Sequence, residues 1–305
     1  MTVSARQHIE RALGGLASGK PYAIVDYPNY ANPGDCAIWI GARAALESLY
    51  GRPPAYVSTA RQFNARQCRN RIRGGTVFFL GGGNFGSLYD KHHRRRLHAL
   101  EKIADMRIVL LPLSVAERAS DGGNPALVAE TKAVLARCRQ LTVFAREHSS
   151  RKQLRETYGI DAALCPDTAH WCSVSDVRPA TDAIGLLRKD SEALPARSRD
   201  DLPESAIFDW RDDRAIIQMN RLGKISPFIP APRLRLAAFD RVARAKVAAA
   251  SKLLGRGDRI VTDRLHGVIL ASLMKRKVAA ADNRTGKVGA YVSTWPQLLP
   301  GVTLN

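Results

Sequence analysis

The segment Asp263-Arg-Leu-His-Gly267 carries side chains that suit the binding of an anion. A short apolar segment precedes it, and apolar residues with helical spacing follow it, so we expect a strand, a turn and a helix capped by Asp263. The free N–H groups and the dipole at a helix start attract phosphate or carboxylate. Arg264 and His266 would add donors there, and Gly267 would let a ligand approach. A capped helix with two surface side chains is the structural alternative.

A second candidate loop lies at residues 28–35, between the apolar segment 22–27 and a helical pattern that ends at residue 50. We expect Asp35 to cap this helix. Asn32 and Gly34 are turn formers as well. A strand, an irregular loop and a helix start are typical of a ligand loop at the carboxyl edge of a parallel sheet. A plain turn between strand and helix fits the same residues.

A glycine-rich loop, Gly81-Gly-Gly-Asn-Phe-Gly86, follows the strongly apolar segment 76–80. Its first, third and sixth residues match the G-x-G-x-x-G pattern of dinucleotide-binding proteins. That pattern requires a carboxylate at the end of the next strand, and none follows the next predicted strand, 107–111. We therefore interpret the loop as a backbone cradle for another ligand, with a tight turn as the alternative. The residues expected to face the ligand are Gly82, Gly83 and Asn84.

Arg146 follows the predicted strand 141–145 directly, so it should lie at the carboxyl edge of the sheet. An ion pair with the adjacent Glu147 is the alternative. The helix after the glycine-rich loop contains the basic run 91–98, which predicts a solvated face or a contact with acidic lipid or pyrophosphate. The histidines of this run lack the spacing of four residues that places two metal ligands on one helical face, so we predict no metal site.

The chain has 305 residues and a net charge of +19, which favours anionic partners. Only 7% of the residues are aromatic and no nucleic-acid recognition motif accompanies the basic runs, so we expect no nucleic-acid partner. The five cysteines form no C-x-x-C pair, which predicts buried thiols in a reducing compartment. No signal peptide and no membrane-spanning run is recognisable. We therefore expect a cytoplasmic protein, peripheral at the inner face of the cytoplasmic membrane.

Apolar strand patterns alternate with helical patterns along most of the chain, which predicts an α/β fold with a doubly wound parallel sheet. A polar, turn-rich segment at 171–182 separates two such series. We therefore predict one Rossmann-like domain at residues 1–170 and another at 171–305. The last helical pattern, near 288–295, is expected to pack back on the first domain.

Taken together, four of these motifs resemble the polysaccharide pyruvyl transferase family in order and spacing. They are Tyr27–Asp35, Phe79–Asn84, Val143–Glu147 and Asp263–Gly267. Leu113 is a departure, because the family often has Gln there. The resemblance implies two Rossmann-like domains that face each other across a cleft, as in GT-B glycosyltransferases. It also implies transfer of pyruvate from phosphoenolpyruvate to two sugar hydroxyls as a cyclic ketal.

The resemblance places donor-binding residues at Arg146 and His266, and Lys287 is the nearest match to a further basic residue of the family's site. Arg264 would complete a set of cations able to hold a phosphate and a carboxylate without a metal or other cofactor. His266 is our candidate for the acid that protonates the enol carbon, and Asp35 for the base. The implied acceptor is a sugar of an exopolysaccharide repeat unit on a lipid pyrophosphate carrier.

Two other functions remain open at this point. A GT-B glycosyltransferase would use the same cleft to bind a nucleotide sugar. A basic protein without enzymatic activity would bind nucleic acid or a membrane surface.

Overall fold

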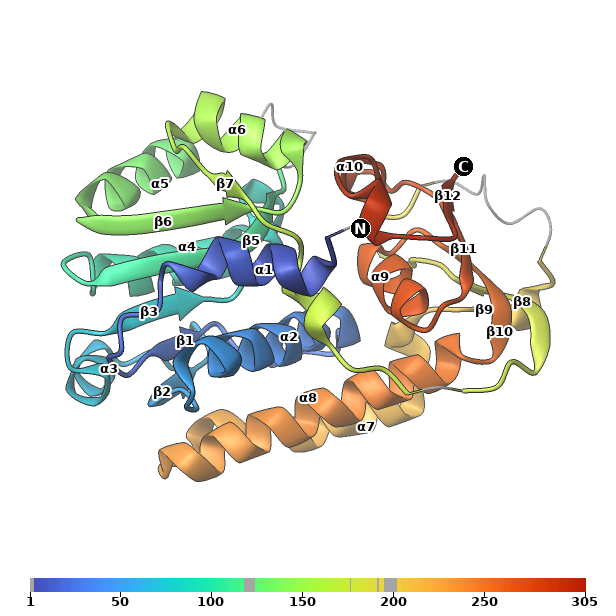
Figure 1. The fold of residues 1–305 in the computed structure, drawn as a ribbon, viewed down its shortest axis with the longest axis horizontal. Helices are drawn as coiled ribbons and strands as arrows, with labels where there is room; N and C mark the ends of the chain where they lie inside the picture. Colours follow the sequence, from blue (N-terminus) through green and yellow to red (C-terminus); the bar gives the residue numbers. More distant parts are fainter. Residues whose placement is uncertain (1–2, 118–123, 176, 191, 195–201) are drawn as a thin grey trace.

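The computed structural model describes residues 3–117, 124–175, 177–190, 192–194 and 202–305. The described strands form two sheets in which every pair is parallel (Figure 1). This confirms the predicted α/β class with parallel sheets. The seven-stranded sheet has the order β2-β1-β3-β5-β6-β7, with β4 beside β5, and the five-stranded sheet has the order β12-β11-β10-β8-β9.

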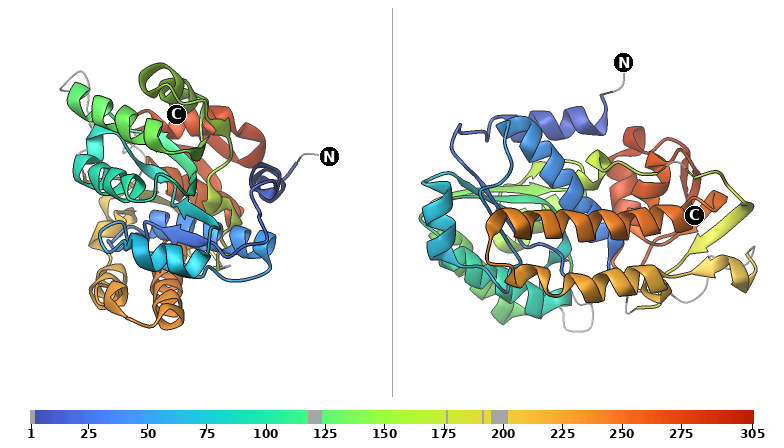
Figure 2. Two further views of the ribbon diagram at one scale, coloured as in Figure 1. Left: turned by 90° about the vertical axis from the view of Figure 1, so that its left-hand side faces the viewer. Right: turned by 90° about the horizontal axis from the view of Figure 1, so that it is seen from below.

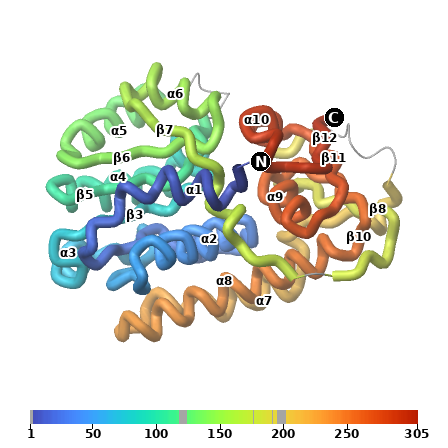
Figure 3. The backbone as a smooth tube through the Cα atoms, viewed as in Figure 1, coloured from blue at the N-terminus to red at the C-terminus, as the bar shows by residue number. Residues whose placement is uncertain are grey.

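The first sheet contains β1 (Ala23–Val25), β2 (Tyr56–Ser58), β3 (Thr76–Phe79), β4 (Gly82–Phe85), β5 (Arg107–Val115), β6 (Gln140–Ala145) and β7 (Ala163–Leu164). The second contains β8 (Thr181–Leu186), β9 (Ile207–Phe208), β10 (Gly257–Thr262), β11 (Lys277–Ala280) and β12 (Val302–Leu304). Figure 3 shows how the chain passes from the first sheet to the second after β7.

The first half of the chain contains the helices α1 (Ala5–Gly14), α2 (Pro33–Tyr50), α3 (Ala65–Ile72), α4 (Asp90–Glu101), α5 (Pro125–Arg137) and α6 (His148–Tyr158). The second half contains α7 (Arg214–Gly223), α8 (Pro232–Leu254), α9 (Leu265–Leu273) and α10 (Lys287–Thr294). The short 3-10 helices include η1 (Ser87–Tyr89), η3 (Thr168–Trp171), η5 (Trp210–Asp212) and η6 (Ser226–Phe228).

Helices cover both faces of the first sheet because its strands are apolar on both sides. In β1, Ile24 belongs to one buried apolar cluster, while Ala23 and Val25 belong to another. Successive side chains of a strand point to opposite faces, so the two clusters lie on opposite sides of the sheet. The cluster around Ile24 also includes Ile184 and Ile260 of the second sheet, so one core connects both halves of the chain.

Strand β5 extends further than the predicted 107–111. It continues through Pro112 to Val115, and β4 pairs with its last residues. The register shifts on either side of Pro112, which has no N–H to donate. A Cβ atom on Gly81 would lie 2.0 Å from the Pro112 carbonyl oxygen, so only glycine fits there. The glycine-rich loop is therefore largely a strand, and the interpretation as a simple turn is wrong.

Helix α8 runs from the second half of the chain along α2 of the first (Figures 1 and 2). The Phe239 ring stacks on Tyr27, with centroids 3.8 Å apart and planes inclined by 2°. Beside this stack, Trp39 Nε1 donates to Asp240 Oδ1 at 2.9 Å. This stacking and hydrogen bond join the second half of the chain to the first.

Helix α10 and the residue that follows it also contact the first half. Trp295 Nε1 donates to the Arg146 carbonyl oxygen at 2.7 Å, and the Asp167 amide donates to the Tyr291 hydroxyl at 2.9 Å. The domain boundary at 170/171 stays a prediction. All five cysteines are buried and unpaired, as predicted. Within the described ranges, no helix is both long and apolar enough to cross a bilayer.

Candidate active site

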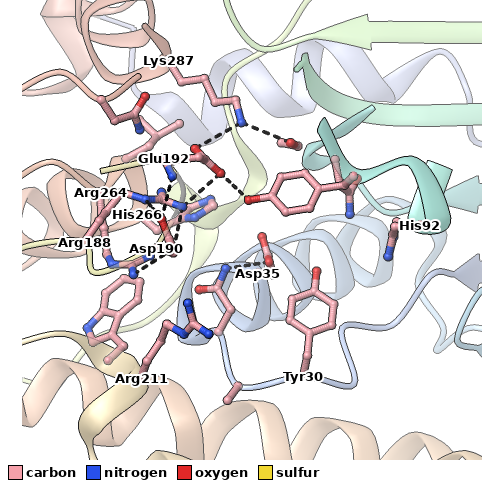
Figure 4. Close-up of a pocket in the computed structure, with 18 of the residues that line it drawn as sticks. Tyr30, Asp35, His92, Arg188, Asp190, Glu192, Arg211, Arg264, His266 and Lys287 are labelled. Atoms are coloured by element: carbon pink, nitrogen blue, oxygen red, sulfur yellow. Dashed lines mark hydrogen bonds and ion pairs between the residues drawn. The ribbon is translucent and has the colours of Figure 1, made fainter. Parts of the chain in front are cut away.

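A cavity of about 460 Å³ lies where strand ends of both sheets meet (Figure 4). From the first half of the chain it is lined by the predicted residues Asn32, Asp35, Gly83, Asn84 and Arg146. From the second half it is lined by Arg264, His266 and Lys287. Eight predicted site residues, separated by up to 255 positions in the sequence, therefore share one cavity. Gly34 and Gly82 are not part of its lining.

The carboxylate of Asp167 joins the two residues for which the sequence argument was strongest. Its Oδ2 atom lies 2.7 Å from Nη1 of Arg146 and 3.3 Å from Nε2 of His266. Burial opposes the ionisation of Asp167, but the charges of His266 and Arg146 outweigh it and hold its pKa well below the usual range. Asp167 therefore fixes the position of both side chains.

Gly83 is the point where Arg146 and Lys287 approach each other. Lys287 Nζ donates to the Gly83 carbonyl oxygen at 3.2 Å. A Cβ atom on Gly83 would lie 3.1 Å from Lys287 Nζ and 3.2 Å from Arg146 Nη2. Burial lowers the pKa of Lys287, and the nearby carboxylate of Glu192 partly offsets this effect. The absence of a side chain at Gly83 thus leaves room beside two cations.

Arg146 is anchored on the side away from Gly83. Its Nε donates to Ser114 Oγ at 2.5 Å and lies 3.4 Å from Glu147 Oε2. Arg146 therefore both lines the cavity and forms the ion pair with Glu147 that the sequence analysis gave as the alternative.

The start of α9 differs from its prediction. The N-cap is Arg264, whose amide donates to Thr262 Oγ1 at 3.1 Å, and the helix begins at Leu265. Asp263 is not the cap, because its Oδ1 accepts the Arg188 amide at the end of the neighbouring strand, at 2.9 Å. Burial raises the pKa of Asp263 to about 6.

Gly267 does not provide room for a ligand. A Cβ atom there would lie 2.6 Å from Thr262 Oγ1 and 2.9 Å from Leu186 Cδ2, so the glycine lets α9 pack closely on the second sheet. The expectation that a ligand approaches this residue is wrong.

Arg264 lines the cavity but already has a carboxylate partner. Its Nη2 lies 2.7 Å from both oxygens of the buried Asp209, and its guanidinium carbon lies 5.6 Å from the Trp210 ring centroid. Arg264 is therefore held rigidly in the wall, on a carboxylate different from the one that binds Arg146.

The start of α2 also differs from its prediction. Asn32 is the N-cap, and its Oδ1 accepts the Gly34 amide at 3.0 Å. Asp35 instead lies in the first turn, where its Oδ2 accepts from Asn32 Nδ2 at 2.7 Å. A Cβ atom on Gly34 would lie 2.4 Å from His266 Nδ1. Gly34 therefore lets the start of α2 pack against the imidazole.

Comparison with known proteins agrees with this arrangement. A sequence model described as polysaccharide pyruvyl transferase matches residues 32–284, which is most of the chain. The chain belongs to the polysaccharide pyruvyl transferase family. Membership confirms the resemblance seen in the four motifs and implies a transferase. The match includes Arg146 and His266 and ends three residues before Lys287.

Two relatives of this pyruvyl transferase family member extend over nearly its full length. It is 25% identical to "Putative pyruvyl transferase EpsO" of Bacillus subtilis, over 99% of this chain and 94% of that protein. It is 24% identical to "Pyruvyl transferase 1" of Schizosaccharomyces pombe, over 95% of this chain and 72% of that protein. The solved structure of an uncharacterized protein from Klebsiella pneumoniae has the same fold, with a TM-score of 0.64 at 15% identity, covering 100% and 99% of the two chains.

The basic run of α4 supplies a cavity residue and a buried arginine that the sequence argument missed. Arg96 is buried, and its Nη2 donates to Asp26 Oδ2 and to Asn84 Oδ1, both at 2.7 Å. His92 lines the cavity, with Nε2 3.0 Å from Asp26 Oδ1. Asp26 has a φ of 79°, which is uncommon outside glycine. The expectation of a solvated face is therefore wrong for this side of α4, and the spacing of four between His92 and Arg96 was the available signal.

A buried carboxylate beside Lys287 was also missed. Glu192 is 3% exposed, and its Oε2 lies 3.6 Å from Lys287 Nζ. Its Oε1 lies 3.0 Å from Arg188 Nη2 and accepts from the Tyr89 hydroxyl. Figure 4 shows Glu192 between Lys287 and Arg188. No sequence motif marked this residue. Among the described residues, no group of three or more His, Cys, Asp or Glu side chains could hold a metal.

Proposed function

We propose that this protein transfers pyruvate from phosphoenolpyruvate to two hydroxyls of a sugar and forms a cyclic ketal. The observation that carries the proposal is the meeting of Arg146, His266 and Lys287 in one cavity. Arg146 and His266 share Asp167 Oδ2, and Arg146 and Lys287 both approach Gly83. Two fixed cations and an imidazole beside a gap at a glycine suit a small anion with two acidic groups.

In this proposal Arg146 and Lys287 bind the donor's phosphate and carboxylate. Both side chains are almost fully buried, so their attraction for an anion is weakly screened by solvent. Arg264 is the remaining arginine that we propose to bind phosphoenolpyruvate. Its bond to Asp209 holds the guanidinium in place and neutralises part of its charge. We therefore expect Arg264 to contribute less donor affinity than Arg146.

The proposed reaction begins when His266 gives a proton to the methylene carbon of phosphoenolpyruvate and a carbon–hydrogen bond forms. The first sugar hydroxyl attacks the neighbouring carbon, and Asp35 accepts its proton. The carbon–oxygen bond to phosphate then breaks, and phosphate leaves with the electron pair. The second hydroxyl closes the ring and its proton passes to the phosphate. The proton on Asp35 restores His266, so the balance requires no metal or other cofactor.

The acceptor that we propose is a sugar of an exopolysaccharide repeat unit on a lipid pyrophosphate carrier. The cavity volume of about 460 Å³ lies within the usual range for sites that bind small molecules. Tyr30 and Tyr89 belong to its lining and are 36% and 40% exposed. Aromatic side chains with an apolar face and a polar tip suit contact with a sugar ring. In this proposal the donor binds beside Gly83, and the acceptor binds next to it against the two tyrosines.

Calorimetric titration of phosphoenolpyruvate tests the donor assignment. We expect binding by the wild type and a loss of at least tenfold in affinity for Arg146→Ala, His266→Ala and Lys287→Ala. Removing a charged hydrogen-bond partner from a buried site costs more binding free energy than removing one from an exposed site. Arg155→Ala on the outer side of α6 is the control and should bind like the wild type.

Turnover with an acceptor sugar separates the chemical roles. His266→Ala and Asp35→Ala should lose activity, and near wild-type rates in either variant would remove that residue from the mechanism. If the wild type binds a nucleotide sugar but not phosphoenolpyruvate, the protein is a glycosyltransferase and the donor assignment is wrong.

A further inference from the structure

An exposed apolar surface lies at the turn between α7 and α8, at the opposite end of α7 from the cavity residues Trp210 and Arg211. We call residues 221–234 the hairpin tip. Four of the large apolar side chains exposed on the described surface lie within these 14 positions, and they are between 59% and 72% exposed. They are Leu222, Ile225, Phe228 and Leu234. Figures 1 and 2 show the tip projecting beyond the first sheet.

The tip presents this apolar surface on a well-packed base. A Cβ atom on Gly223 would lie 2.8 Å from Val242 Cγ1, so α7 and α8 are in close contact there. The Ser226 hydroxyl donates to the Gly223 carbonyl oxygen at 2.6 Å, and Ser226 and Pro227 are buried. The exposed apolar side chains are therefore held on the outer side of a structured turn.

Basic residues accompany the apolar ones. Arg221, Lys224 and Arg233 are exposed, and the described structure pairs none of them with an acidic side chain. Residues 214–239 contain no Asp or Glu. The tip is therefore a cationic surface with large apolar side chains between the charges.

We propose that the hairpin tip docks on an anionic phospholipid bilayer. Its apolar side chains would enter the boundary between headgroups and acyl chains, while Arg221, Lys224 and Arg233 would contact lipid phosphates. Docking of a second copy of the chain on this tip is disfavoured, because it would place two sets of cations against each other without acidic partners.

The tip adjoins the amino end of a strand of the first sheet, whereas the cavity lies at the carboxyl ends of the strands. Arg235, next to the tip, is buried with its guanidinium carbon 6.0 Å from the ring centroid of Tyr56, the first residue of β2. The cavity instead includes Arg146, which follows the last residue of β6. Bilayer docking therefore leaves donor binding unchanged, and it stands or falls independently of the proposed function.

Sedimentation with vesicles of equal parts phosphatidylglycerol and phosphatidylcholine tests the proposal. We expect the wild type to bind at about 0.15 M salt, where charges are screened beyond roughly 8 Å. The double variant Arg221→Gln/Lys224→Gln should bind about 30-fold more weakly, because each charge near an anionic surface strengthens binding about fivefold. Ile225→Ser/Phe228→Ser should bind at least tenfold more weakly.

Two controls separate the tip from the general basic charge and from general hydrophobicity. Lys132→Gln/Arg139→Gln removes two exposed charges elsewhere, and Leu304→Ser removes an exposed apolar side chain at the other end of the molecule. Both should bind vesicles nearly as well as the wild type. All variants should keep the wild-type melting temperature and affinity for phosphoenolpyruvate, since none lines the cavity.

Several results would overturn the proposal. The wild type could stay in the supernatant, or it could bind neutral phosphatidylcholine vesicles equally well. The control variants could lose as much binding as the tip variants, or the Ile225→Ser/Phe228→Ser variant could still bind. If that variant instead abolishes a dimer seen by sedimentation equilibrium, the tip is an interface between copies. A wild type that binds vesicles but not phosphoenolpyruvate leaves the docking proposal intact and contradicts only the proposed function.

Discussion

At the scale of single residues, the candidate site depends on Asp167. Its Oδ2 atom contacts Arg146 and His266, and its Oδ1 accepts the Ala169 amide at 2.8 Å. The carboxylate is fully buried, so it has no water to replace these partners. We expect Asp167 to act as a positioning residue for the Arg146 and His266 side chains.

The substitution Asp167→Asn should lower stability and weaken donor binding together. An amide of the same size leaves Arg146 with less compensation for its buried charge, which costs roughly 3–5 kcal/mol in comparable sites. Urea unfolding at pH 7 and titration of phosphoenolpyruvate measure both effects. Asp161→Asn, at an exposed position, is the matched control and should change stability by less than about 0.5 kcal/mol.

The pH dependence of this loss has a defined sign. The pKa of Asp167 is depressed in the folded state from an unfolded value near 4. Its carboxylate therefore stabilises the fold above about pH 4, and that contribution is lost as pH falls further. The stability gap between wild type and Asp167→Asn should narrow below pH 4, whereas a constant gap would show that charge is not the cause.

At the scale of elements, close packing of α2 against η3 places Asp167. Asp167 is the N-cap of η3, and Thr168 Oγ1 donates to the Ile38 carbonyl oxygen of α2 at 3.1 Å. Gly41 permits this contact, because a Cβ atom there would lie 1.7 Å from the Thr168 carbonyl oxygen. The same helix meets the imidazole of His266 at Gly34.

Gly41→Ala should therefore destabilise the protein although alanine favours helices. Backbone cannot move aside as easily as a side chain, so we expect a loss of about 3 kcal/mol and weaker donor binding. Gly14→Ala in α1, where nothing lies within 4 Å of the new Cβ, is the control and should change stability by less than about 1 kcal/mol. Equal stability of the two variants by thermal unfolding would disprove the close contact.

At the scale of the whole molecule, α8 connects the two halves of the chain. Phe239 is fully buried and stacks on Tyr27, within the same apolar cluster that reaches both sheets. A shared core should make both halves unfold together.

Phe239→Ala should cost about 3–5 kcal/mol, because it leaves a cavity in this shared core. Unfolding followed by circular dichroism and by tryptophan fluorescence should give one coincident transition in the wild type. Phe228→Ala, the same substitution at a 70% exposed position, should leave stability nearly unchanged. Two well-separated transitions in the wild type would contradict a common core.

Local sequence patterns were sufficient to predict the class of fold and eight of the residues that line the cavity. Parallel strands that end at one edge bring their following residues together, so Arg146, Gly83 and Asp35 could be placed from strand ends alone. Helix caps were less predictable. Asp263 and Asp35 have the right side chains for caps, yet tertiary partners determine what those side chains bind.

The sequence by itself determined an α/β fold with parallel sheets, the family and the presence of Arg146, His266 and Lys287 as candidate cations. Only the tertiary structure decided that Asp167 joins the first two and that Gly83 leaves space beside the third. It also decided that Arg96 and Glu192 are buried rather than exposed. Arg96 forms an ion pair with Asp26, and Glu192 forms one with Lys287. The physical reason is that burial and ion pairing depend on which segments meet in space, whereas strand and helix periodicity is a property of neighbouring residues.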